Sequence, residues 1–252
     1  MKILTVIHEF PPIGGGGGLI ARDLACALVR DGNEVRVITA QFGDLPDREV
    51  LDGVEIIRLK SHRKEAYRAK LLTMASFILA ASRYCVYQMK DFSPDIIHAH
   101  FAVPGGPPAK FISGKKHVPY VLTVHLGDIP DASPEKTGKW FKFIYPFTHT
   151  FWKHASAIVA VSEFSKRMAQ RKYPVEIQVI PNGIDYDQVR IDRIEPHSVP
   201  EIVFAGRFVP QKNLEQLVKV CAAIKDLNWH CTLIGDGQDR EKIEELIKRL
   251  NL

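Results

Sequence analysis

The sequence predicts an α/β protein built around a parallel sheet. Short runs rich in β-branched residues alternate along the chain with longer segments whose apolar residues recur at helical spacing. The first run, residues 3–8, is apolar almost throughout, which is typical of a strand that helices cover on both faces. Because parallel strands need long crossover connections, the alternation favours a parallel sheet over an antiparallel one.

The first 183 residues contain most of the predicted elements. Strands are predicted at residues 3–8, 34–39, 54–58, 95–99, 120–125, 157–161 and 176–180. Helices are predicted at residues 19–30, where Asp31-Gly32 supplies a stop signal, and at residues 65–90. A polar loop is expected between the second and third strands. The turn signal at residues 181–183 closes this first domain, residues 1–183.

A second, smaller unit follows a segment without periodicity, residues 184–199, which we expect to be a linker. Residues 200–252 show a strand–helix–strand–helix pattern, with elements predicted at residues 202–205, 213–225, 230–234 and 239–250. Two strands and two helices are too few to cover both faces and both edges of a parallel sheet. We therefore expect a complete first domain and the opening half of a second one, that is, a truncated chain.

The composition is that of an ordinary globular protein, with 46% hydrophobic and 25% charged residues, which excludes a disordered chain or a coiled coil. The chain has four cysteines, and no two of them form a C-x-x-C motif. They are Cys26, Cys85, Cys221 and Cys231. This favours a reducing, cytoplasmic location. The longest apolar stretch, residues 71–81, is shorter than the roughly 18–20 residues of a membrane span.

Two segments suggest contact with a membrane or a lipid-linked acceptor. Segment 58–70 accounts for most of the net charge of +5, through Arg58, Lys60, Arg63, Lys64, Arg68 and Lys70. Segment 140–152 is rich in aromatic residues, namely Trp140, Phe141, Phe143, Tyr145, Phe147, Phe151 and Trp152. Together they could lie on the inner face of an anionic membrane. The alternative, slightly favoured, is an aromatic core helix beside a solvated basic loop. Nucleic acid is not an expected partner, because no aromatic or base-reading stripe accompanies the charge.

A run of five glycines, from Gly14 to Gly18, lies between the first strand and the first helix. Glycines there allow close approach of a ligand, and a helix N-terminus attracts an anion. The run lacks the dinucleotide fingerprint, because Leu19 stands where its third glycine belongs, and it lacks the Gly-Lys-Ser/Thr of a Walker A loop. An anion or a sugar is the favoured ligand; a flexible loop without a ligand is the alternative.

His125 follows an apolar strand at its carboxyl end, where open α/β sheets bind ligands. It could contact a substrate hydroxyl or move a proton; a structural histidine bonded to a loop carbonyl is the alternative. His98 and His100 stand two residues apart at another strand end, without a third metal ligand. We expect these two to be structural, and we expect no metal site.

The second unit offers two cations at a strand-to-helix corner. Arg207 follows the strand directly and Lys212 precedes the helix, so the pair is well placed to hold a diphosphate. Solvated surface charge is the alternative. Gly235 and Gly237 end the next strand, where a tight turn explains them nearly as well as a ligand contact.

Taken in order, these motifs resemble glycosyltransferase family 4, retaining enzymes of the GT-B fold. The motifs, which extend over essentially the whole chain, are FPPIGG (10–15), HAH (98–100), TVH (123–125), VSE (161–163), IPNGID (180–185), VFAGR (203–207) with Lys212, and LIGDG (233–237). The resemblance implies two Rossmann-like domains that face each other across a cleft. The acceptor would bind mainly to the first domain and the sugar nucleotide mainly to the second.

The resemblance also implies roles for single residues. Gly15–Gly18 would lie against the donor phosphates or sugar, and His125 would contact the donor sugar near its reacting carbon. Arg207 and Lys212 would neutralise the departing diphosphate, a role that needs no metal ion or other cofactor. Further contacts with donor or acceptor are expected at Asp128, Ser162, Glu163, Asn182, Gly235 and Gly237.

The implied activity is transfer of a sugar, a hexose in the family pattern, from a nucleotide diphosphate to a glycan, lipid-linked or small acceptor, as in polysaccharide biosynthesis. The family's late Glu-x7-Glu motif is missing, because Glu241, Glu244 and Glu245 have the wrong spacing. We therefore expect weak or no activity from this chain alone. A non-catalytic module that binds acceptor or membrane, and a GT-B sugar-nucleotide epimerase, are the alternatives.

Overall fold

The computed structural model describes residues 1–66, 69–130, 141–190 and 198–252. The chain divides into two compact units, Met1–Val189 and Arg190–Leu252. The segment expected as a linker contains a short helix, α7 (Tyr186–Val189), so the first unit reaches past residue 183. Among the described residues, no helix is long and apolar enough to cross a bilayer.

The first unit is built on an eight-stranded sheet with the order β3-β4-β2-β1-β5-β6-β7-β8. All its neighbouring strands run parallel except β3 and β4. The strands are β1 (Lys2–Val6), β2 (Glu34–Ala40), β3 (Arg48–Leu51), β4 (Val54–Leu59), β5 (Ile96–His100), β6 (Tyr120–Val124), β7 (Ala157–Ala160) and β8 (Gln178–Val179). The order reverses between β1 and β5, which makes their carboxyl ends the expected ligand site of an open α/β sheet.

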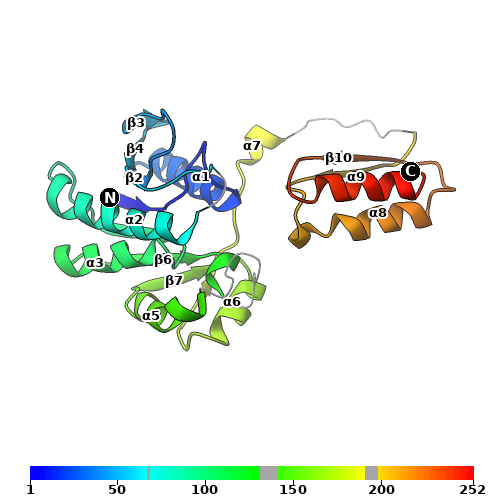
Figure 1. The fold of residues 1–252 in the computed structure, drawn as a ribbon. Helices are drawn as coiled ribbons and strands as arrows, with labels where there is room; N and C mark the ends of the chain where they lie inside the picture. The colour runs from blue at the N-terminus through cyan, green and yellow to red at the C-terminus, as the bar shows by residue number, and fades with distance from the viewer. Residues whose placement is uncertain (67–68, 131–140, 191–197) are drawn as a thin grey trace. The chain divides into compact units, whose positions relative to one another are not determined.

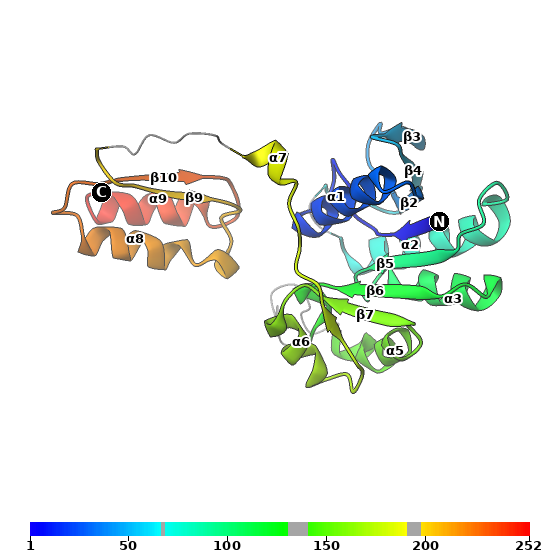
Figure 2. The same ribbon diagram turned by 180° about the vertical axis from the view of Figure 1, so that it is seen from behind.

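Helices cover both faces of this sheet (Figures 1 and 2). The longer ones are α1 (Gly16–Arg30), α2 (Leu71–Arg83), α3 (Gly106–Lys116), α5 (Phe141–Lys153) and α6 (Glu163–Gln170). Buried side chains of α2, α3 and α5 share one core with the strands, and those of α1 share a second core with the opposite face. The central strands bury apolar side chains on both faces because helices cover both faces of the sheet.

Two predicted elements of the first unit were wrong in extent. The helix predicted from residue 65 begins only at Leu71 and continues from Tyr84 as one π-helical turn. Its start is displaced because the backbone oxygens of Glu65 and Ala66 accept hydrogen bonds from the Arg63 guanidinium, at 3.1 and 2.8 Å. The helix predicted from residue 19 begins earlier, at Gly16, inside the glycine run.

Strand β3 lies where we expected only a polar loop. It pairs with β4 through the two-residue turn Asp52-Gly53, whose φ angles of 50° and 79° belong to a hairpin. This edge strand is largely exposed, so it carries no apolar alternation that a sequence pattern could detect.

The basic segment 58–70 is not a continuous charged surface. Arg58 is buried and bonds to a Glu49 carboxylate oxygen at 2.5 Å, and Arg63 is buried as well. Lys60, Lys64 and Lys70 are exposed, and Arg68 lies outside the described residues. Two of the six cations on which the expected membrane contact rested therefore bind inside the protein.

The aromatic segment 140–152 is partly buried and partly exposed. Trp152 is buried and stacks on Tyr173, with ring centroids 4.1 Å apart, so one side of α5 belongs to the core. Phe143 and Phe147 are 79% and 70% exposed. Trp140 lies outside the described residues. The helix therefore has a core side and an exposed aromatic side.

The second unit contains the four predicted elements. They are β9 (Glu201–Ala205), α8 (Leu214–Ala223), β10 (His230–Ile234) and α9 (Arg240–Arg249). The two strands pair in parallel, and the helices bury a small core of Phe208, Leu214, Val218, Ile243 and Leu246 against one face. On β9, exposed and half-buried residues alternate, as expected for a strand covered on one side.

Helix α2 offers a matched pair of substitutions that tests which of its faces carries stability. Phe77 is fully buried under the sheet, whereas Leu79 is largely exposed. We expect Phe77→Ala to lower the free energy of unfolding by about 3–5 kcal/mol, through lost contacts and the cavity left behind. We expect Leu79→Ala to change it by about 0.5 kcal/mol or less. Urea titrations followed by circular dichroism measure both, and equal losses would contradict this packing.

Candidate active site

The candidate site lies at the carboxyl ends of β1, β5 and β6, which are neighbours in the sheet. Because the three strands run parallel, the segments that follow them emerge at one edge. They carry the glycine run after β1, Phe101 after β5 and His125 after β6. The structure thus brings together two features that lie more than 100 residues apart in the sequence.

The glycine run divides into two classes. A Cβ atom on Gly14 would lie 2.5 Å from the Glu9 Cβ, and Gly14 also has a φ of +94°. A Cβ atom on Gly18 would lie 2.8 Å from the Glu9 carbonyl oxygen. A Cβ atom on Gly17 would lie 2.5 Å from the Phe101 ring. By contrast, a Cβ atom on Gly15 or Gly16 would meet no atom of the described structure within 4 Å. Three glycines are therefore required by packing, and two border open space.

Helix α1 begins at this open space. Gly15 is its N-cap and offers no side-chain cap, and its carbonyl oxygen accepts the N–H groups of Gly18 and Leu19. The first turn contains no acidic residue of its own, and the nearby carboxylate is that of Glu9, with one oxygen 3.5 Å from the place of a Cβ atom on Gly17. An anionic or hydroxyl-bearing ligand could approach the backbone N–H groups directly.

Phe101 links the glycine run to His125. Its ring lies under Gly17 and packs against the His125 ring, with centroids 4.4 Å apart. Its φ of +66° is unusual for an aromatic residue. Gly105 accompanies this backbone turn, because a Cβ atom on it would collide with the His100 carbonyl oxygen. The conformation therefore depends on close backbone packing after β5.

Asp128 is directed into the protein. Its carboxylate accepts hydrogen bonds from the backbone N–H of His125, at 2.8 Å, and of Val103, at 3.4 Å. The carboxylate ties the loop after β6 to the loop after β5 and fixes the backbone of His125. Its buried position favours this positioning role over the direct ligand contact that we expected.

Three further histidines surround this edge, and burial keeps them neutral. Burial lowers the pKa of His8 to about 3, with help from the nearby charges of Arg63 and His125. Burial lowers the pKa of His98 to about 4 and places the pKa of His100 well below its usual value. His98 Nε2 lies 2.8 Å from the Thr123 hydroxyl. Among the described residues, neither ring nitrogen of His100 has a hydrogen-bond partner.

Glu9 and Arg63 belong to the site, although the sequence analysis assigned neither to it. The Arg63 guanidinium is buried and donates hydrogen bonds to three backbone oxygens, including that of His8 at 3.0 Å. The Glu9 carboxylate opposes the lowering of the Arg63 pKa that burial causes. A signal for Glu9 was present, because it directly follows the first predicted strand. Arg63 could not be found from the sequence, because it arrives from a distant loop.

The remaining predicted residues of the first unit have diverse surroundings. Ser162 follows β7 and caps α6, its hydroxyl oxygen accepting the Ser165 N–H at 3.1 Å. Glu163 begins α6 and is exposed, and Asn182 is exposed in the loop after β8. Ser162 therefore has a structural role that explains its presence without a ligand.

In the second unit, Arg207 follows β9 and Lys212 ends the 3-10 turn Pro210–Lys212 before α8. Both are exposed, and the described residues give neither an ion-pair partner. Gly235 and Gly237 are explained by packing, because a Cβ atom on either would collide with the backbone of Gly206 or of Phe208. No three His, Cys, Asp or Glu residues of the described structure could hold a metal ion together.

The buried histidines predict a decline of stability in mild acid. In the unfolded chain each binds a proton below about pH 6.5, whereas in the folded protein His8 and His98 do so only near pH 3 to 4. The contribution of the neutral histidines to the free energy of unfolding is thus complete above pH 6.5. It is lost as the pH falls towards 4, because the unfolded chain then binds protons that the folded protein does not. Each histidine contributes a slope of up to about 1.4 kcal/mol per pH unit. Urea titrations at pH 7.5, 6 and 5 should show a shallower decline in His98→Gln than in the exposed control His154→Gln; equal slopes would refute this.

Comparison with protein families gives two consecutive matches. Residues 14–188 match Glycosyltransferase Family 4, and residues 186–252 match Glycosyl transferases group 1. An uncharacterized glycosyltransferase of Methanocaldococcus jannaschii is 27% identical over all of the chain and 67% of its own length. The proposed teichuronic acid biosynthesis glycosyltransferase TuaC of Bacillus subtilis is 26% identical over 63% of the chain and 42% of its own length. The chain spans from 41% to 67% of the length of the curated relatives that it matches.

Among solved structures, sucrose-phosphate synthase from Thermosynechococcus elongatus is similar to this chain, with a TM-score of 0.73 and 18% identity. The match covers all of this chain and 68% of the synthase chain. Likenesses of this kind confirm the predicted GT-B type α/β fold, with the larger parallel sheet followed by the short two-stranded one. The first family match covers more than half of the residues and includes the glycine run and His125. The chain therefore belongs to Glycosyltransferase Family 4.

Proposed function

We propose that this chain takes part in sugar transfer from a nucleotide diphosphate sugar to a glycan, lipid-linked or small-molecule acceptor, with retention of configuration. One observation carries the proposal. The glycine run, with its open positions Gly15 and Gly16, is connected to His125 through the Phe101 ring. This arrangement places the open space beside Gly15 and Gly16 at a helix N-terminus on the same sheet edge as His125. The family membership supports the reaction class.

In this proposal the first unit holds the reacting sugar. The N–H groups at the start of α1 would meet a phosphate or sugar oxygen beside Gly15 and Gly16. His125 would contact a sugar hydroxyl near the reacting carbon, and Asp128 would keep its backbone in place. The neutral histidines around it add no competing positive charge at neutral pH.

The second unit supplies the charge that the leaving group needs. As the bond between the sugar carbon and the diphosphate breaks, negative charge develops on the phosphate oxygens. Arg207 and Lys212 would stabilise that charge, the guanidinium through paired N–H donors and the ammonium as a point charge. The acceptor oxygen then bonds to the same carbon from the same side, and its proton passes to the departing phosphate.

The cation pair is tested by donor binding to the chain. Saturation-transfer NMR with a panel of UDP-, GDP- and ADP-sugars detects even millimolar binding. We expect Arg207→Ala and Lys212→Ala each to weaken binding of the preferred donor by about tenfold or more, because a charge-assisted hydrogen bond is lost. Lys248→Ala, an exposed cation of α9, is the matched control. Unchanged affinity in the first two variants would refute the role of the pair.

The open glycine positions make a separate prediction. Gly16→Val fills space that no protein atom occupies, so the melting temperature should stay close to that of the wild type. Donor or acceptor binding should fall about tenfold or more, because the side chain excludes the ligand from the helix N-terminus. Leu24→Val places the same branched side chain about two turns further along α1 as a control. Binding that survives Gly16→Val would place the ligand elsewhere.

Transfer itself is tested with a radiolabelled sugar nucleotide and a mixture of glycan, lipid-linked and small acceptors. The proposal expects a labelled product whose linkage keeps the donor configuration, and less product from His125→Ala. Conversion of the donor without any acceptor would indicate an epimerase. Acceptor binding without turnover, even when a donor-domain half is supplied, would indicate a binding module. Either result would overturn the proposed function.

A further inference from the structure

Three neighbouring helices on one face of the first unit carry no acidic residue. They are α2 with its π-helical extension, α3 and α5, and α3 lies between the other two. The cationic side chains described on them are Arg83, Lys110, Lys115, Lys116 and Lys153. Among the described helices of eight or more residues, the others all contain at least one Asp or Glu. Among the described helices of this length, the α2–α3–α5 layer is therefore the group whose described charged side chains are all cationic.

The same layer exposes an unusual amount of apolar side chain. Every helix of the layer contributes, through Leu71, Leu72, Leu79, Val86, Tyr87, Phe111, Phe143 and Phe147. Leu72 and Leu79 are 65% and 66% exposed and lie about two turns apart on one side of α2. Their neighbour Phe77 is buried, so α2 has an apolar residue pattern on both its inner and its outer side. Exposed apolar groups that gather on one face indicate a binding surface.

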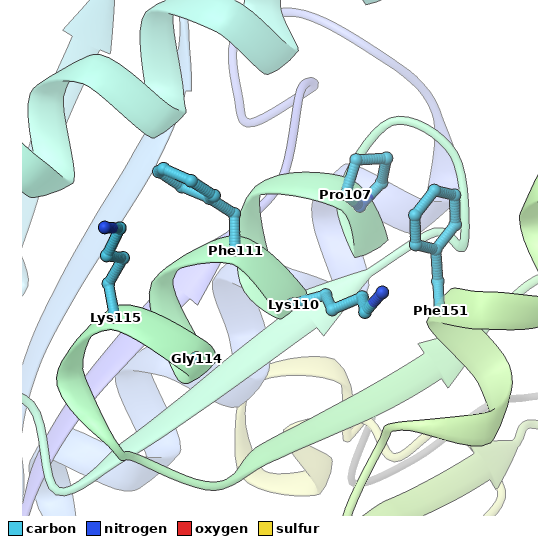
Figure 3. Close-up of a pocket in the computed structure, with 6 residues that line it drawn as sticks. All are labelled: Pro107, Lys110, Phe111, Gly114, Lys115 and Phe151. Atoms are coloured by element: carbon cyan, nitrogen blue, oxygen red, sulfur yellow. The ribbon is translucent and has the colours of Figure 1, made fainter.

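A shallow pocket of about 530 Å³ lies on this layer, between α3 and α5. Its lining combines three apolar rings with two amines, from Pro107, Phe111, Phe151, Lys110 and Lys115. Figure 3 shows Pro107, Lys110, Phe111 and Lys115 along α3 and Phe151 on α5, with the Lys110 amine directed towards the Phe151 side of the pocket. That amine lies 2.7 Å from the Thr150 hydroxyl, so it is held at the rim. The lining suits a molecule with a negative head and an apolar body.

We propose that the α2–α3–α5 layer docks on the surface of an anionic phospholipid bilayer. The leucine and phenylalanine side chains would enter the interface between headgroups and acyl chains, and the lysines would meet lipid phosphates. The pocket between α3 and α5 would take part of one anionic lipid. Lysine stems can cover apolar surface while their amines reach the headgroups, so the two kinds of side chain act together.

The charge of the layer argues against two other occupants. A second copy of the chain, docked by two-fold symmetry through the same face, would bring like charges together with no carboxylate of these helices to pair with them. Nucleic acid would match the charge but would leave the exposed leucines in water, because phosphates and sugars give aliphatic side chains no partner. A bilayer matches both the charge and the apolar surface.

Vesicle flotation with the whole chain tests the proposal, using phosphatidylcholine vesicles with and without phosphatidylglycerol. We expect binding to the anionic vesicles that weakens as salt is added, and little binding to the neutral ones. Lys110→Glu combined with Lys115→Glu, and Leu72→Ser combined with Leu79→Ser, should each lower binding about tenfold or more. Lys248→Glu and Leu24→Ser, on α9 and α1, serve as controls and should change it less than about twofold.

Thermal unfolding of every variant keeps the test interpretable, because all substituted side chains except that of Lys110 are exposed and should leave the fold intact. Equal binding to neutral and anionic vesicles, or equal losses in the control variants, would overturn the proposal. So would a dimer in solution that the leucine substitutions dissociate, or an RNA complex that the lysine substitutions abolish. Loss of vesicle binding leaves donor binding untouched, so this result is separate from the test of the proposed function.

Discussion

The packing of the glycine run on the Phe101 ring is the contact on which the arrangement of the site depends. Gly17 lies so close to the Phe101 ring that no side chain fits between them, and the same ring packs against the His125 ring. Phe101 can occupy this place only because the backbone after β5 turns back tightly, which the absence of a side chain at Gly105 permits. A single aromatic residue thereby sets how far the loop after β1 lies from the loop after β6.

The strands were predictable because burial on both faces leaves a strong local signal. The runs at residues 34–39 and 120–125 are rich in β-branched residues, and both are strands in the structure. Strand β3 was not predictable, because an exposed edge strand has no such signal. The early part of the predicted helix at residues 65–90 failed for a different reason. The neighbouring Arg63 binds the backbone oxygens of Glu65 and Ala66, and helix propensity does not report a side-chain contact of that kind.

The site was predictable only where a residue stands directly at the end of a strand. His125 and the glycine run could be found in this way, since the carboxyl edge of an α/β sheet is a general ligand position. Phe101, which joins them, gave no signal, because an aromatic residue after a strand is ordinary in sequence. The charge on segment 58–70 likewise gives no sign of which of its cations are buried. A formal charge count cannot distinguish Arg58 and Arg63, which bind inside the protein, from the exposed Lys64.

The two classes of glycine in the run also bear on how this protein could change over evolutionary time. Gly14, Gly17 and Gly18 are held by the fold, so a side chain at any of them would have to displace Glu9 or Phe101. A side chain at Gly15 or Gly16 would displace no neighbouring residue of the described structure. A lineage could therefore try new side chains at the mouth of the site, and so explore new ligands, without first acquiring compensating changes in the core. Gly16, which tolerates a side chain, and Gly17, which does not, are therefore neighbours in the chain.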